Sequence, residues 1–113
     1  MNCNNIIATP EFSKALKRLA KHYKSIKNDF SLLLEQLKEN PTMGIDLGRG
    51  LRKIRMTITS KGKGKSGGAR VITLVTIHEI NSAEVMLLAI YDKSERENIS
   101  DKELSDLLKH NGL

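Results

Sequence analysis

Basic side chains alternate with apolar ones along one stretch of the chain, at a spacing that suits phosphate chemistry. Lys53 and Arg55 are two residues apart in a segment of strict alternation, so both fall on the polar face of a predicted strand, about 6–7 Å apart. Arg70 begins the next predicted strand and can lie beside them, while Tyr91 and Lys93 stand at the end of a third. The spacing therefore predicts a cationic cluster on one face of a sheet.

Such a cluster could cleave RNA. The reaction needs cations around a phosphate that gains charge in the transition state, a base for the 2′-hydroxyl and an acid for the leaving 5′-oxygen. Arg55 and Arg70 suit the phosphate clamp, Lys53 and Lys93 are candidates for proton transfer, and Tyr91 could stack on a base. A Lys-x-Arg pair on a strand is more often an ordinary feature of the protein surface. What favours a catalytic role is that all five of these residues are predicted to gather on one face of the sheet.

The positive charge is concentrated around these residues. The net charge is +6; eight of the 19 basic residues lie between positions 49 and 70 with no acid among them, which leaves 11 basic against 13 acidic residues elsewhere. Concentrated charge of one sign predicts a polyanionic partner, and the alternative is a solvated basic loop. Beyond the cluster above, we expect contacts to RNA or the ribosome from Arg49, Arg52, Lys61, Lys63 and Lys65.

Several other kinds of site are not supported. One cysteine, Cys3, provides neither a disulfide framework nor a metal site, and the three histidines fall in separate predicted elements. The run GKGKS at 62–66 resembles a phosphate loop, but Thr59 stands where that motif needs glycine. The sequence also shows neither a signal peptide nor a membrane-length apolar run. We therefore expect a cytoplasmic protein that uses no metal or cofactor.

The elements that must position these residues form one α+β domain over residues 1–113. Periodicity and capping signals predict a helical hairpin, three antiparallel strands and a short last helix. In chain order, we expect a short strand at 5–8, helices at 9–24 and 25–40, strands at 53–59, 69–77 and 84–91, and a helix from 100. The Gly/Lys-rich segment 61–68 is expected to be a loop.

Three motifs in this order give the chain a family resemblance: NPTMGIDLGRGLRKIRM (40–56), SGGARVI (66–72) and LLAIYDKSERENIS (87–100). Together they resemble the RelE/ParE superfamily of toxins from type II toxin–antitoxin systems, and most of all its RelE/HigB-like branch. The resemblance implies a microbial ribonuclease-like fold, with the helical hairpin packed on a small antiparallel sheet. It also implies metal-free, ribosome-dependent cleavage of messenger RNA, which inhibits translation.

The resemblance further implies partners and roles. A cognate antitoxin, typically with a helix-turn-helix region, would neutralise the toxin, and DNA would be met only through that complex. By position, the family's two strand lysines fall on Lys53 and Arg55, its phosphate-binding arginine on Arg70, and its basic residue after the last strand on Lys93. The family's tyrosine at the start of the last helix is replaced by Ile99.

That replacement leaves Tyr91 either as the functional aromatic residue, as in HigB-like relatives, or as a packing residue. Two alternative functions of the protein also stay open. One is a ParE-type poison of DNA gyrase, which shares the fold but needs no such basic cluster. The other is a degenerate toxin that binds its antitoxin without activity.

Overall fold

A computed structural model describes residues 2–62, 67–80, 82–96 and 98–113. The elements in chain order are β1 (Asn2–Ala8), α1 (Pro10–His22), α2 (Ile26–Glu39), β2 (Ile45–Gly48), β3 (Leu51–Met56), the 3-10 turn η1 (Thr59–Lys61), β4 (Ala69–Glu79), β5 (Ser82–Asp92) and α3 (Asp101–His110).

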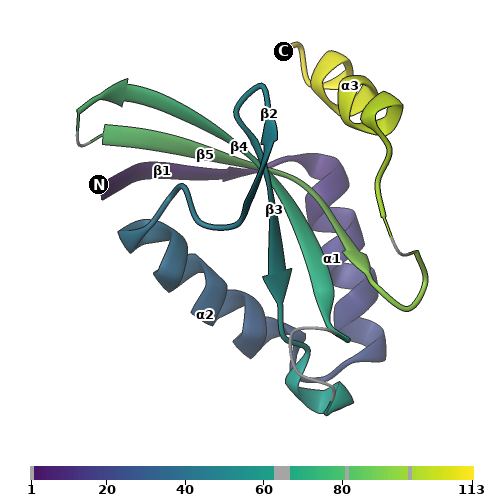
Figure 1. The fold of residues 1–113 in the computed structure, drawn as a ribbon. Coiled ribbons are helices and arrows are strands. Elements are labelled where there is room, and N and C mark those ends of the chain that lie inside the picture. The colour runs from purple at the N-terminus through teal and green to yellow at the C-terminus, as the bar shows by residue number, and fades with distance from the viewer. Residues whose placement is uncertain (1, 63–66, 81, 97) are drawn as a thin grey trace.

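The five strands form one mixed sheet with the order β1-β5-β4-β3-β2. The pairs β2–β3, β3–β4 and β4–β5 are antiparallel, whereas β1 runs parallel to β5. The helices α1 and α2 lie on one side of the sheet and α3 lies near the other side, close to the end of β5 (Figure 1). The strands β3, β4 and β5 are thus neighbours, as their alternation predicts.

Local signals fix where the helices begin. Thr9 caps α1 by accepting a hydrogen bond from the Phe12 amide, and Pro10 occupies the first turn. Ser100 and Glu103 form the capping box predicted for α3. Ser25 precedes α2 but makes no capping bond to its backbone, because its hydroxyl hydrogen-bonds to Asp29 and Ser60 instead.

The sheet separates two apolar clusters. The larger one buries Phe12 and Leu19 of α1 and Leu37 of α2 against side chains from the middle strands. The smaller one lies on the opposite face, where Leu104 of α3 packs with four residues of the sheet. The apolar run of β5 supplies both clusters, with Leu87 in the first and Leu88 in the second. The strand β5 is therefore buried on both faces, which accounts for its nearly continuous apolar sequence.

The structure confirms the α+β fold class and adds two features. The strand β2 forms a hairpin with β3 whose turn residues Gly48, Arg49 and Gly50 all have positive φ. Its four residues are mostly exposed, so they carry no alternating pattern by which the sequence could predict a strand. The first strand is longer than expected and joins β5 in parallel. Within the described residues, no helix is long and apolar enough to cross a membrane.

Gly68 is a position where only glycine fits. A Cβ atom built there would lie 2.1 Å from the Met56 carbonyl oxygen, which belongs to the neighbouring strand and cannot move aside freely. We expect Gly68→Ala to lower the free energy of unfolding by about 3 kcal/mol, the upper range for overpacking. Gly62→Ala is the control, since its Cβ meets open space and only its positive φ is strained, at roughly 1–2 kcal/mol. Urea denaturation would measure both, and equal losses would contradict the steric explanation.

Candidate functional site

Three of the predicted site residues form a row across the sheet. Arg55 of β3 is the cross-strand partner of Arg70 of β4, and Arg70 is the partner of Tyr91 of β5. Lys53 lies two residues before Arg55 on the same strand, so alternation places it on the same face. The antiparallel register therefore brings together four residues that lie as many as 38 positions apart in the sequence.

The row combines an exposed and a buried arginine. Arg55 is exposed, whereas Arg70 is only 4% exposed and donates a hydrogen bond to the Ala69 carbonyl oxygen at 3.1 Å. Burial, and then the positive charge of Arg55, lower the pKa of Arg70. Two guanidinium groups at paired positions of adjacent strands suit the binding of a phosphate.

Tyr91 is packed rather than open. It is 6% exposed and belongs to the smaller apolar cluster with Leu104 of α3. The guanidinium of Arg96 lies 5.2 Å from the centre of its ring. Burial raises the pKa of the Tyr91 phenol, against the opposing effect of Arg96 and Arg70. Of the two roles left open for Tyr91, packing is the one that this conformation displays, and stacking on a base would require Arg96 to be displaced.

The C-terminal segment contacts two further predicted residues. The Lys53 ammonium donates to the Asn98 side-chain oxygen at 3.4 Å, and Arg49 donates to the Ser105 hydroxyl of α3 at 2.9 Å. Both bonds are exposed and are therefore easily exchanged for bonds to a phosphate. No sequence pattern indicated Asn98 or Ser105, because their contacts depend on how α3 returns to the sheet.

The remaining predicted residues are more scattered. Arg52 lies 3.8 Å from Asp46 in an ion pair across the β2–β3 hairpin. Lys93 follows β5, and its backbone N–H donates to the Gly68 carbonyl oxygen. Lys61 is largely buried and forms an ion pair with Asp92 at 2.8 Å, contacts that favour an anchoring role over the predicted contact with RNA. The predicted contacts of Lys63 and Lys65 lie outside the described residues.

Two buried aspartates, which the sequence analysis did not single out, anchor the turn between β3 and β4. Asp29 of α2 accepts hydrogen bonds from the Thr59 amide and hydroxyl. Asp92 accepts from Lys61 and from the Tyr23 hydroxyl, the latter at 2.6 Å. Asp29 could have been noticed, since it lies three residues after Ile26 on the apolar face of its helix.

Burial by itself raises the pKa of Asp92, but hydrogen bonds from Lys61, Tyr23 and Ser94 outweigh burial and hold the pKa of this carboxyl well below its usual range. Lys61 and Tyr23 each donate a hydrogen bond to Asp92, and this bond raises the pKa of each donor. The Asp92 carboxylate and the Lys61 ammonium therefore form a charged pair that the fold stabilises.

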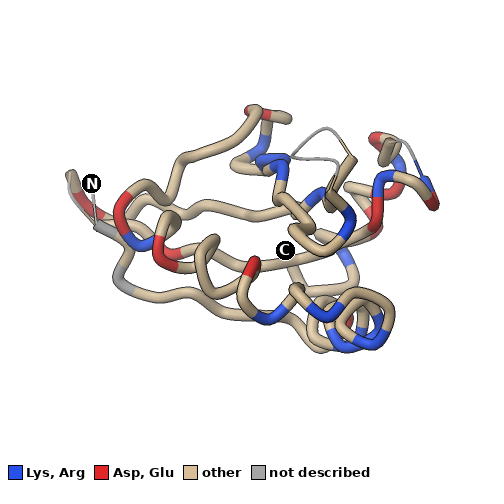
Figure 2. The backbone as a smooth tube through the Cα atoms, turned by 90° about the horizontal axis from the view of Figure 1, so that it is seen from below, with Lys and Arg blue, Asp and Glu red and all other residues tan. Residues whose placement is uncertain are grey.

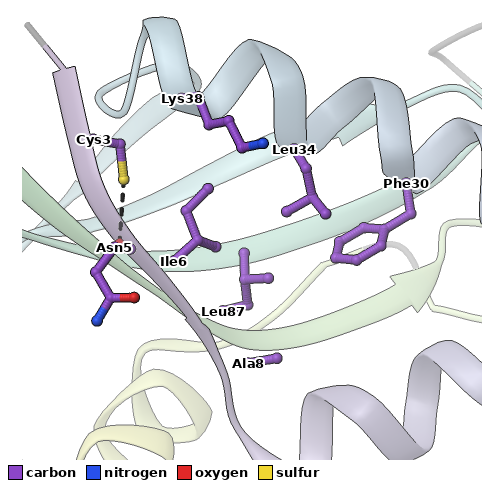
Figure 3. A pocket seen from close by; sticks show the side chains of 8 residues that line it. All are labelled: Cys3, Asn5, Ile6, Ala8, Phe30, Leu34, Lys38 and Leu87. Atoms are coloured by element: carbon purple, nitrogen blue, oxygen red, sulfur yellow. Dashed lines mark hydrogen bonds between the residues drawn. The ribbon is translucent and has the colours of Figure 1, made fainter.

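A cleft of about 420 Å³ lies between β1 and α2, and its lining differs from that of the row. Figure 3 shows Ile6, Leu34 and Phe30 along it, with the Cys3 thiol turned toward the Asn5 carbonyl oxygen at 3.2 Å. This lining offers no cluster of groups suited to phosphate chemistry. Among the described residues, no three histidine, cysteine or acidic side chains are grouped to hold a metal ion.

The distribution of charge over the whole molecule is consistent with a binding site for a polyanion. Figure 2 shows basic positions crowded toward one end of the molecule, whereas the other end carries mainly acidic ones. An approaching polyanion would therefore be attracted to the basic end of the molecule.

Removing the Tyr91 hydroxyl provides a test of its environment. The hydroxyl is buried and has no hydrogen-bond partner among the described residues. Because an unpaired buried hydroxyl is unfavourable, we expect Tyr91→Phe to raise the free energy of unfolding by about 1 kcal/mol. Tyr23→Phe is the matched control and should lower it, because the Tyr23 hydroxyl donates to Asp92. Chemical denaturation of both variants would check this, and a clear loss of stability in Tyr91→Phe would contradict it.

The fold and the row together define a small α+β protein with a cationic, phosphate-attracting sheet face. A family model described as the RelE toxin of the RelE/RelB toxin–antitoxin system matches residues 12–112. The chain therefore belongs to the RelE toxin family and is a toxin of a toxin–antitoxin system, with an antitoxin as its partner. This finding confirms the resemblance that the three sequence motifs suggested.

Proposed function

We propose that this toxin is a ribosome-dependent endoribonuclease that cleaves messenger RNA and thereby inhibits translation. The observation that carries the proposal is the cross-strand pair of Arg55 and Arg70 with Lys53 on the same face. Three cations on a rigid sheet match the needs of a phosphate that becomes more negative as it reacts. A protein that acted only by binding would not need them grouped in this way.

In the proposed reaction the 2′-hydroxyl loses its proton and attacks the adjacent phosphorus, and the bond from phosphorus to the 5′-oxygen breaks. The products are a 2′,3′-cyclic phosphate and a 5′-hydroxyl end. Arg55 and Arg70 hold the phosphate. Lys53 and Lys93 are the candidates for removing the first proton and supplying the second, since Lys53 lies on the face of the row and Lys93 follows Tyr91 by two residues.

The ribosome is the proposed site of action because the basic segment from Arg49 to Arg70 extends well beyond a single phosphate. Exposed Arg49 reaches α3, and Lys63 and Lys65, whose contacts with RNA are expected from the sequence, belong to the same basic segment. Contacts of this kind are tolerant of sequence and weaken with salt. A cytoplasmic location follows from this proposal.

The test is a reconstituted translation reaction in which messenger RNA ends are mapped by primer extension, with a ribosome-free reaction beside it. New 5′-hydroxyl ends that appear only with ribosomes would support the proposal. If the message stays intact and translation is unaffected, the proposal is wrong. A DNA gyrase supercoiling assay on the same preparation would then test the alternative of a gyrase poison, and inactivity in both assays would indicate a degenerate toxin.

A further inference from the structure

A second cleft adjoins the row and has no role in the proposed phosphate chemistry. It has a volume of about 470 Å³ and lies between α1 and α3, with Arg18 on one wall and Leu107 on the other. Tyr91 and Arg96 line it as well. The cleft shares Tyr91 with the row, and Tyr91 is the cross-strand neighbour of Arg70. A base next to a phosphate bound at Arg70 would lie within reach of this cleft.

The cleft contains a planar surface on which a base could stack. The guanidinium of Arg96 covers the Tyr91 ring and is held by the Asn98 carbonyl oxygen, at 3.2 Å and 3.1 Å, and by Glu103. Its side chain is 40% exposed. Guanidinium planes are common stacking partners for unpaired RNA bases. Arg96, rather than the buried Tyr91, is then the group that offers a stacking face.

The cleft also carries carboxylates, which are unfavourable near the phosphates of a bound RNA unless they contact its bases. Glu95 and Asp106 line it, both are exposed, and neither forms an ion pair with another described residue. Carboxylates repel phosphate, but they accept hydrogen bonds from the amino groups of adenine, cytosine and guanine. The hydroxyl of Tyr91, buried and without a partner among the described residues, is a further polar group at this cleft.

We propose that this cleft is a nucleobase subsite, in which one base of the RNA stacks on Arg96 and donates hydrogen bonds from its exocyclic amino group to Glu95 or Asp106. The subsite takes adenine, cytosine or guanine and rejects uracil, which has no amino group. This inference rests on the proposed function, because it assumes that RNA binds along the row. It adds a basis for sequence preference that the cationic row cannot provide.

The first experiment measures which bases the toxin prefers in the codon that it cleaves. A message library with a randomised codon is translated in the reconstituted reaction, and its new ends are sequenced. We expect one codon position at which uracil is cleaved roughly 10-fold more slowly than the other bases. The double variant Glu95→Gln/Asp106→Asn should reduce this difference to about 2-fold or less, because an amide is a weaker acceptor than a carboxylate.

The matched control is Glu35→Gln/Glu39→Gln, which removes the same charge from α2, outside the cleft. It should keep the wild-type preference, so that a general gain in RNA affinity can be separated from a change in selectivity. A wild-type protein that cleaves without discriminating against uracil, or a double variant with unchanged preference, would overturn the subsite.

The second experiment does not need cleavage, so its outcome is independent of the proposed function. Isotope-labelled toxin is titrated with adenosine trinucleotide and with uridine trinucleotide while the amides of Ile99 and Leu107 are followed by NMR. We expect millimolar adenosine trinucleotide to shift these cleft residues and uridine trinucleotide to shift them far less, with both effects lost in Arg96→Ala. Equal shifts, or none, would show that the cleft does not select a base.

Discussion

Arg70→Ala is expected to slow ribosome-dependent cleavage of messenger RNA by about 10²–10³-fold, the loss typical of removing one group that stabilises transition-state charge. Arg70 lies beside Arg55 on the neighbouring strand and is almost fully buried, so its charge acts with little screening by water. Exposed Arg55 is more strongly hydrated, and we expect Arg55→Ala to cost about 10-fold. The rates would be measured by primer extension in single-turnover reactions.

The control for this prediction is Lys38→Ala, which removes one positive charge from an exposed position on α2. It should leave cleavage unchanged, because Lys38 is outside the row and is already paired with Glu35. Thermal unfolding of each variant would show whether Arg70→Ala still folds. A folded Arg70→Ala variant that cleaves at the wild-type rate would contradict the phosphate clamp, even if cleavage by the wild type is established.

The double variant Arg55→Ala/Arg70→Ala would show whether the two arginines act as one unit. If both hold the same phosphate, the double variant should be slower than Arg70→Ala by much less than the loss caused by Arg55→Ala alone. Losses that multiply independently would instead place the two side chains on different phosphates. Their cross-strand pairing favours the shared phosphate.

Asp92→Asn is expected to lower the free energy of unfolding by about 3–5 kcal/mol, the usual effect of removing one partner of a buried ion pair. Asp92 is 1% exposed, and its loss would leave the Lys61 ammonium, with a side chain 11% exposed, without its anion. The Tyr23 hydroxyl would lose its acceptor as well. Urea denaturation at neutral pH would measure the change, and a loss under about 1 kcal/mol would mean that the pair contributes little.

A double-mutant cycle would isolate the pair. Lys61→Met removes the cation, so Asp92→Asn should be much less destabilising in that background than in the wild type. Equal effects in both backgrounds would assign the loss to the hydrogen bonds from Tyr23 and Ser94 instead.

The same carboxyl predicts a pH dependence. The pKa of Asp92 in the folded protein lies below its ordinary value of about 3.9, so the unfolded chain binds the proton more tightly. The stabilisation is therefore fully present above about pH 5 and is lost progressively as the pH falls below 4. Wild type and Asp92→Asn should accordingly converge in stability on acidification. A difference that stays constant from pH 7 to pH 3 would contradict this assignment.

The sequence by itself determined the order of the main elements and the composition of the site. Alternation from Lys53 onward places Lys53 and Arg55 on one strand face, because successive side chains of a strand point to opposite sides. Caps at Thr9 and Ser100 fixed helix starts, since their side chains bond to amides within the next turn. These relations are local, so no knowledge of the rest of the chain was needed.

Only the tertiary structure decided how these local pieces combine. The pairing of Arg55 with Arg70 and of Arg70 with Tyr91 depends on strand register, which side-chain alternation limits but does not fix. The covering of Tyr91 by Arg96 depends on the path of the chain between β5 and α3. In the sequence, Lys61 is indistinguishable from the other basic residues of a basic loop. Only the folded structure places Asp92 beside it. Charge and periodicity can be obtained from the sequence alone. The burial of a side chain and its hydrogen-bond or ion-pair partners depend on how distant segments pack together.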